Sequence, residues 1–154
     1  MNMHLRHVET NQDIHAAFAV MRELRPHLVD VDAFIAQVER QAREGYRLLG
    51  TWQGTELVGL AGYRLQENLI YGRFLYIDDL VTTCSVRSTG VGAALVGAVR
   101  EEAYRHDCKQ LILDTALGNA RGQHFYFRQG LLSPALHFGQ ALSKQRVFQI
   151  PLTP

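Results

Sequence analysis

A short glycine-containing segment decides the fold of this chain, and it runs Arg87-Ser88-Thr89-Gly90-Val91-Gly92-Ala93. It lies between an apolar run that ends near Thr82 and a helix expected to begin near Thr89. Glycines at a helix start let the backbone approach a ligand, and the N–H groups of the first helical turn attract anions. The segment therefore predicts a phosphate or pyrophosphate site, although a tight turn with close helix packing would leave the same pattern.

Two other phosphate-binding patterns do not fit this segment. The P-loop pattern GxxxxGK[ST] is absent from the sequence, and the dinucleotide pattern GxGxxG has Leu95 at its third glycine position. The neighbouring strands also read as antiparallel rather than as a βαβ unit. A nucleotide-triphosphatase and a Rossmann enzyme are therefore disfavoured.

Helices and strands are expected on both sides of the glycine segment. Before it, periodicity and capping residues predict a strand over 3–8, helices over about 11–26 and 30–45, and strands over 46–52, 56–65 and 69–82. From it onward they predict a helix over 89–106, a strand over 109–114, a helix over 118–128 and a closing pair of strands over 134–142 and 145–150. The order βααβββαβαββ predicts an α/β (α+β) fold with a mixed, mostly antiparallel sheet flanked by helices.

Two adjacent acids interrupt the apolar run FLYIDDLV within the predicted strand 69–82. They are Asp78 and Asp79, and a buried carboxylate is costly unless it is paired and hydrogen-bonded. On a regular strand the two side chains would point to opposite faces. We expect them either to belong to a functional site or to bond to backbone amides at the strand end.

Length and composition indicate one compact domain over residues 1–154. The chain is 47% hydrophobic with a formal net charge of +1, which disfavours nucleic acid as a partner. No segment approaches the ~20 apolar residues of a membrane span, and no secretory leader is recognisable. Cys84 and Cys108 have no CxxC spacing and the histidines have no HxxxH or HxH grouping, so neither a disulfide framework nor a metal site is expected. These observations favour a protein of the reducing cytoplasm.

The glycine segment resembles the acetyl-CoA loop of the GCN5-related N-acetyltransferases (GNAT family), which reads Arg/Gln-x-x-Gly-x-Gly/Ala. Arg87, Gly90 and Gly92 match this pattern, while Ser88 replaces the glycine that usually follows the loop arginine. The expected order of strands and helices is also that of the family, so the resemblance extends over nearly the whole chain.

A second signature of the family lies in the helix expected over 118–128. It is an asparagine followed seven residues later by a tyrosine, in a helix that ends before a glycine, and Asn119, Tyr126 and Gly130 match it. Gly122 replaces an alanine that is frequent in this helix, so looser packing is expected there. The resemblance implies an enzyme that moves the acetyl group of acetyl-CoA directly to a primary amine, without a covalent acyl-enzyme.

The resemblance also assigns the residues that would bind acetyl-CoA. They are the strand residues Leu80, Val81 and Thr82, the loop residues Arg87, Ser88, Thr89, Gly90, Val91, Gly92 and Ala93, and Asn119. A bulge carried by the family's strand would free N–H groups of residues 80–82 to pair with the pantetheine and polarise the thioester carbonyl. Arg87 and the loop amides would hold the pyrophosphate, and Asn119 would bind the pantetheine arm.

Three residues are candidates for the acid–base chemistry. Tyr126 would donate a proton to the departing thiolate, unless it is only a core aromatic residue. One of Asp78 and Asp79 would bind or deprotonate the amine while the other supports the site, and the sequence leaves open which does what. Cys84 is interpreted as structural, because no basic partner is placed beside it.

The acceptor is less constrained than the donor. The stretch from Tyr76 to Asp79 is similar to the Tyr-Leu-Glu-Asp stretch of spermidine/spermine and related small-amine acetyltransferases, which favours a small amine or polyamine. Lys144 and Arg146 favour an acceptor with a carboxylate instead. The acceptor pocket is expected from residues 30–45 and the loop 139–146.

Other functions remain open on the same fold. They are acetylation of a protein N-terminus or lysine, and a non-catalytic sensor of acyl-CoA. Dimers are common in the family, so a homodimer is compatible with the resemblance.

Overall fold

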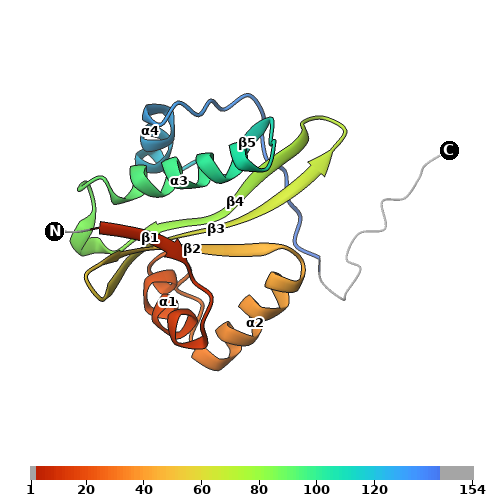
Figure 1. Cartoon of the computed structure of the whole chain (residues 1–154). Helices are drawn as coiled ribbons and strands as arrows, with labels where there is room; N and C mark the ends of the chain where they lie inside the picture. Colours follow the sequence, from red (N-terminus) through yellow and green to blue (C-terminus); the bar gives the residue numbers. More distant parts are fainter. Residues whose placement is uncertain (1–2, 143–154) are drawn as a thin grey trace.

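The computed structural model describes residues 3–142 and contains four α-helices around a five-stranded sheet (Figure 1). The elements are β1 (Met3–His7), α1 (Asn11–Leu24), α2 (Val31–Arg43), β2 (Tyr46–Gln53), β3 (Glu56–Asn68), β4 (Gly72–Thr82), a 3-10 turn η1 (Cys84–Val86), α3 (Val91–Arg105), β5 (Gln110–Leu113) and α4 (Ala120–Arg128). Each predicted element up to residue 128 is present, with ends displaced by a few residues.

The sheet has the strand order β1-β2-β3-β4-β5, and its neighbouring strands follow one another in sequence. The first three pairings are antiparallel, and only β4 and β5 are parallel, because α3 crosses over between them. Helices α1 and α2 cover one face, and α3 and α4 cover the other (Figure 1). The prediction of a mixed, mostly antiparallel sheet flanked by helices is therefore confirmed.

Each face of the sheet has its own apolar core. Ile14, Phe34 and Leu60 are buried between the sheet and the α1–α2 layer, whereas Leu75 and Leu95 are buried between the sheet and α3. The two layers are thus anchored separately, and the strands between them can present side chains to both.

Side chains cap the helices of the first layer. The Thr10 hydroxyl accepts a hydrogen bond from Asp13 N–H at α1, and the Asp30 carboxylate accepts one from Ala33 N–H at α2. The cap of α1 thus lies one residue before the predicted start at 11, and the cap of α2 coincides with the predicted start at 30.

Strand β4 carries one extra residue at Asp78. Gly62 pairs with Asp79 and the next residue of β3, Tyr63, pairs with Ile77, so Asp78 bulges out of the ladder. The parallel pairing with β5 also ends at Ile77, which pairs with Leu113. Strands β4 and β5 therefore part at the position of the acids, as the resemblance implied.

The observed elements differ from the predicted ones at the closing strands. Residues 134–142 form no strand in the structure, and the partner expected over 145–150 lies outside the described residues, as do Lys144 and Arg146. A strand exists only with a neighbour to accept its hydrogen bonds, and no described segment pairs with 134–142. Leu136 and Phe138 in this segment are exposed.

Candidate active site

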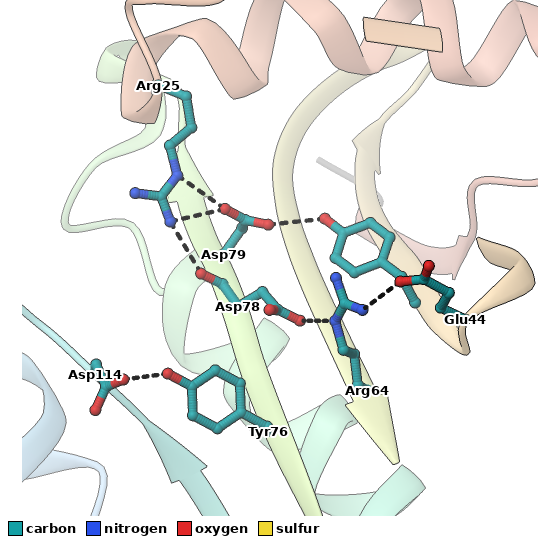
Figure 2. A network of polar contacts seen from close by, with 8 residues as sticks. Arg25, Glu44, Arg64, Tyr76, Asp78, Asp79 and Asp114 are labelled. Carbon is teal, nitrogen blue, oxygen red and sulfur yellow. Dashed lines mark hydrogen bonds and ion pairs between the residues drawn. The ribbon is translucent and has the colours of Figure 1, made fainter. Parts of the chain in front are cut away.

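The side chain of Asp79 is fixed by two partners from the α1–α2 layer (Figure 2). Its Oδ1 accepts a hydrogen bond of 3.0 Å from Arg25 Nε at the C-terminal cap of α1, and its Oδ2 accepts one of 2.8 Å from Tyr46 Oη at the start of β2. Burial, and then the neighbouring carboxylate, raise the pKa of Tyr46, which keeps the phenol protonated as a donor. Asp79 is therefore a carboxylate held in one position by two donors.

The side chain of Asp78 is bound less completely. Its Oδ2 accepts a 3.0 Å hydrogen bond from Arg64 Nε, and its backbone carbonyl accepts another of 3.0 Å from Arg25 Nη2 (Figure 2). Within residues 3–142, no donor reaches its other carboxylate oxygen. Burial raises the pKa of Asp78 above its ordinary value, although Arg64 opposes this. Of the two acids, Asp78 is thus the one with a free oxygen and increased proton affinity.

Gly62 makes room for the contact between Tyr46 and Asp79. It lies opposite Leu48 on β2 and Asp79 on β4, and a Cβ at this position would overlap the Tyr46 hydroxyl. Only glycine lets the phenol cross the strand to reach the carboxylate. Sequence reasoning assigned no role to this glycine.

A cavity of about 200 Å³ opens beside Asp79 on the α1–α2 side of the sheet. We call it the acceptor pocket, and it is lined by Met21, Arg25, His27, Leu28, Phe34, Gln37, Val38, Gln41, Tyr46 and Asp79. The lining is mixed: Met21, Leu28, Phe34 and Val38 are apolar, and the other lining residues are polar or charged. Phe34, Gln37, Val38 and Gln41 come from the predicted range 30–45, no residue of 139–142 lines the cavity, and residues 143–146 lie outside the described residues.

A second polar cluster lies where β4 and β5 part. The Tyr76 hydroxyl donates to Asp114, and His137 Nδ1 lies 3.1 Å from the same Asp114 oxygen, Oδ2. Burial is the largest cause that raises the pKa of Tyr76, followed by its bond to Asp114. Figure 2 shows this pair beside Asp78.

On the other side of β4, the start of α3 has the geometry of an anion site. Gly90 (φ 94°) and Ser88 (φ 64°) adopt the left-handed conformation, and no side chain caps α3. The first backbone bond of the helix is donated by Ala94 to the Gly90 carbonyl, so the N–H groups of residues 91–93 precede the helical ladder. This arrangement of N–H groups fits a pyrophosphate.

Arg87 turns toward α1 in this structure. Its Nη2 lies 3.3 Å from Glu23 Oε2, and the same oxygen accepts a 3.0 Å hydrogen bond from Cys84 N–H. Glu23 thereby ties the acetyl-CoA loop, residues 87–93, to the end of α1. Its hydrogen bond also raises the pKa of the Cys84 thiol, which agrees with a structural role for that cysteine.

Residues 80–82 lie between the two sites. Leu80, Val81 and Thr82 keep their register with β3, so the bulge does not release that edge. Their opposite edge extends beyond Ile77, the last residue of β4 with a β5 partner. Among residues 3–142, no strand pairs with this edge beyond Ile77, because β5 ends at Leu113.

Helix α4 approaches this edge through Phe125. A Cβ on Gly92 would lie 3.3 Å from Phe125 Cζ and 3.9 Å from Thr82 Cγ2, so α3, α4 and the end of β4 converge there. Tyr126 follows directly on α4, half-buried, with a T-shaped contact to Phe125 and a pKa raised by burial. No described contact joins Tyr126 to Asp78 or Asp79.

Asn119 is the N-cap of α4. Its Oδ1 accepts a 3.0 Å hydrogen bond from Gly122 N–H, and its Nδ2 donates to Thr115 Oγ1 at 3.0 Å. A Cβ on Gly122 would crowd the Asn119 amide, so the glycine accommodates the cap. The side chain that was predicted to bind pantetheine therefore has a structural function in this structure.

The structure thus groups the candidate residues around β4. Asp79 lines the acceptor pocket on one side, with Asp78 beside it in β4, and residues 80–82 lead toward the loop 87–93 on the other. Sequence reasoning missed Arg25, Tyr46 and Arg64, which bind the two acids. The only signal for them in the sequence was that buried acids need hydrogen-bonding partners.

Residues 3–142 contain neither a cluster of metal-ligating side chains nor a membrane-spanning helix. No group of three or more His, Cys, Asp or Glu side chains is placed to share a metal ion. In this part of the chain, no helix combines the length and apolarity needed to cross a bilayer.

Comparison with known proteins assigns the family. Residues 12–131 match the Acetyltransferase (GNAT) family, so the chain belongs to the GNAT acetyltransferases and is an acetyl-CoA-dependent N-acetyltransferase. It is 26% identical over 125 residues to an uncharacterized N-acetyltransferase, YhdJ, of Bacillus subtilis (strain 168). The aligned region covers 80% of this chain and 87% of the relative.

Solved structures share the fold at lower identity. AAC(6')-Iy in complex with the bisubstrate analogue CoA-S-monomethyl-acetylneamine superposes with a TM-score of 0.82 at 16% identity, covering 93% of this chain and 99% of that one. Glucosamine-6-phosphate N-acetyltransferase from Arabidopsis thaliana superposes with a TM-score of 0.75 at 14% identity, covering 93% and 100%. At these identities the likeness establishes the GNAT fold.

Proposed function

We propose that this enzyme transfers the acetyl group of acetyl-CoA directly to a small primary amine in the acceptor pocket, with Asp78 as the general base. Asp78 carries the proposal, because it bulges out of β4 where β5 ends, has a raised pKa and keeps one carboxylate oxygen without a described partner. Asp79 supports the site, since Arg25 and Tyr46 already engage both of its oxygens.

A base is needed because amines are protonated at neutral pH. An alkylammonium of pKa ~10.4 is neutral in only about one molecule in two thousand at pH 7, a cost of ~4.6 kcal/mol. Asp78 accepts the proton from the ammonium group, directly or through water. The amine nitrogen then forms a bond to the acetyl carbonyl carbon and the carbon–sulfur bond breaks. The nitrogen gives up its second proton, which replaces the proton delivered to the sulfur, and Asp78 releases the first proton to solvent.

Tyr126 is the proposed donor of the proton to the sulfur. Burial raises its pKa, so the phenol is protonated at neutral pH and available as a donor while charge develops on the sulfur. Acetyl-CoA supplies the activated acetyl group as a thioester. The N–H groups of residues 91–93 would bind its pyrophosphate, Arg87 would exchange Glu23 for the same anion, and the β5-side edge of residues 80–82 would bind the pantetheine, with Asn119 near its arm.

The structure favours some acceptors over others. Both acids form ion pairs with arginines, at 2.9 Å for Arg25 with Asp79 and 3.0 Å for Arg64 with Asp78. This arrangement weighs against a polyamine, which requires uncompensated negative charge. The size of the cavity favours a small molecule over a protein N-terminus or a lysine side chain.

The test is release of free CoA from acetyl-CoA across a panel of amines. We expect Asp78→Asn to lower kcat/KM by on the order of 10²–10⁴, the usual contribution of a general base. The matched control is Asp32→Asn in the exposed first turn of α2, which should leave turnover unchanged. Full turnover in Asp78→Asn would refute the assignment of the base.

Two further variants test the donor side. Tyr126→Phe should lower kcat and spare acetyl-CoA binding, whereas Tyr104→Phe, an exposed tyrosine on α3, should change neither. Arg87→Glu should weaken acetyl-CoA affinity in calorimetry. Binding of acetyl-CoA without turnover of any amine would favour the sensor function or a protein acceptor.

We also propose that the enzyme works in the cytoplasm without a metal ion, since Cys84 and Cys108 are free thiols and the chemistry above needs none. A single domain over 1–154 and a homodimer remain predictions.

A further inference from the structure

Glu23, in the last turn of α1, contacts the segment that leads into the acetyl-CoA loop at two points. Its Oε2 accepts hydrogen bonds of 3.0 Å from both the backbone N–H and the thiol of Cys84, and a longer one of 3.3 Å from Arg87 Nη2. Cys84 begins the turn η1, and Arg87 is the C-cap of that turn. A single carboxylate oxygen therefore meets both ends of η1.

The two contacts differ in how easily they can be given up. The hydrogen bond to Glu23 raises the pKa of the Cys84 thiol, so the thiol stays protonated as a donor. The Arg87 side chain is 58% exposed and that of Glu23 is 29% exposed, and ion pairs near the surface contribute little to stability. Release of Arg87 would leave Glu23 with both Cys84 donors, so its carboxylate would not be left without partners.

Glu23 and a bound pyrophosphate would compete for Arg87. Under the proposed function, Arg87 and the N–H groups of residues 91–93 bind that anion, and in this structure the Arg87 guanidinium is paired with Glu23 instead. The apparent affinity of a ligand falls by the fraction of the protein in which its site is available. A carboxylate at position 23 should therefore weaken the binding of acetyl-CoA.

We propose that Glu23 is a positioning residue of the acetyl-CoA site, which anchors Cys84 and holds Arg87 until the pyrophosphate of acetyl-CoA displaces it. This inference rests on the proposed binding of pyrophosphate by Arg87 and adds the group that competes for that arginine. Glu23 thereby sets the affinity for donors that carry a pyrophosphate, because the anion must displace the carboxylate from Arg87.

Calorimetric titration of the full chain with acetyl-CoA tests this competition. Glu23→Gln keeps an oxygen that can accept the Cys84 N–H bond but removes the charge that pairs with Arg87. We expect it to lower the Kd of acetyl-CoA about two- to fivefold, the range for a partly exposed ion pair. The gain should shrink as the salt concentration rises from about 0.05 to 0.5 M, because salt screens exposed charges. Acetyl-dephospho-CoA keeps the pyrophosphate but lacks the ribose phosphate, so it should show the same gain.

Two further variants separate the competition from a general effect of charge. Arg87→Met removes the guanidinium, and in this background Glu23→Gln should no longer tighten binding. Glu39→Gln removes the same charge from an exposed position on α2 and should leave the Kd of acetyl-CoA unchanged. Thermal unfolding of each variant without ligand shows whether the fold is kept.

The inference and the proposed function can fail separately. An unchanged or higher Kd in Glu23→Gln, an equal gain in the Arg87→Met background, or a gain lost with acetyl-dephospho-CoA would overturn the role of Glu23 and leave the acetyltransferase in place. If Arg87→Met alone left the Kd unchanged, the assignment of Arg87 to the pyrophosphate would fall, and the inference with it. Absence of acetyl-CoA binding to the unmodified protein would overturn the proposed function itself.

Discussion

Replacement of Tyr46 by phenylalanine tests how firmly the acid pair is built into the fold. The Tyr46 hydroxyl is the only described donor to Asp79 Oδ2, at 2.8 Å, and the tyrosine is 5% exposed. A hydrogen bond to a charged group contributes about 1.5–3 kcal/mol, and its loss leaves a poorly solvated oxygen without a partner. We expect Tyr46→Phe to lower the free energy of unfolding by about 2 kcal/mol.

The assay is equilibrium unfolding in urea combined with calorimetry at pH 8. For a domain of this length, about 1 kcal/mol corresponds to roughly 2–4 °C in Tm, so Tm should fall by about 4–8 °C. Tyr63→Phe is the matched control, because Tyr63 is fully buried and its hydroxyl lies 2.8 Å from His7 Nε2, with no described hydrogen bond to a carboxylate. An average hydrogen bond contributes about 1 kcal/mol, which predicts a fall of about 2–4 °C.

The stabilities of Tyr46→Phe and Tyr63→Phe together test whether Asp79 depends on the Tyr46 hydroxyl. If Tyr46→Phe destabilised the protein no more than Tyr63→Phe, the carboxylate of Asp79 would not depend on the phenol, and its fixed position would have to be abandoned. Gly62→Ala gives independent evidence, because the added methyl group overlaps the Tyr46 hydroxyl and should displace it from Asp79.

Three further predictions concern residues outside the acid pair. Arg6 holds the pKa of Asp13 at about 2, so this pair should stabilise the fold above about pH 4 and lose its effect as the pH falls toward 2. In urea unfolding from pH 5 to 2, Asp13→Asn should therefore lose less unfolding free energy on acidification than the unmodified protein. Gly90→Ala should destabilise the fold by about 1–2 kcal/mol, because Gly90 has a left-handed conformation. Gly97→Ala should stabilise it by about 0.5–1 kcal/mol in the same denaturation assay, because Gly97 lies inside α3 with open space around it. Stability changes of the same sign in both variants would contradict this prediction. Asn119→Ala should cost about 1 kcal/mol as a lost cap, whereas Asn119→Ser should keep most of that stability, so a drop in acetyl-CoA affinity in both variants, measured by calorimetry, would identify a separate role in binding pantetheine.

The prediction of an acetyl-CoA loop rests on a contiguous pattern. Residues 87–93 follow one another, and a helix start with glycines at fixed spacing is a local property of the chain. The structure adds what local patterns do not contain: Gly90 rather than Thr89 precedes the first helical residue, and Arg87 meets Glu23 on α1.

The partners of the acids could not be recognised in this way. Asp79 meets Arg25 across 54 residues of sequence and Tyr46 across 33, while Asp78 meets Arg64 across 14. Each pairing follows from strand register and from where α1 ends, which are tertiary properties. The sequence could indicate that buried acids need partners, but the choice between Asp78 and Asp79 as base required those partners to be known.

The closing strands were predicted from β-type patterns in residues 134–150. Such a pattern reports only that a segment would fit a half-buried sheet surface, and strand formation depends on a neighbour. In the described part of the chain that neighbour is absent for 134–142, and the interaction of His137 with Asp114 is not visible in any local pattern.

The bulge at Asp78 has a consequence for the alternation of side chains along β4. Leu75 and Ile77 face the α3 core before it, whereas Leu80 faces that core after it and Val81 faces the opposite one. Odd and even positions thus exchange faces at Asp78, as if one residue had been inserted into an otherwise regular strand. A chain with Asp78 deleted would alternate without interruption, and Ile77 and Asp79 would pair with Tyr63 and Gly62 as consecutive residues. The pairing of β3 with β4 can therefore be completed without Asp78, so the architecture of the sheet does not require this residue.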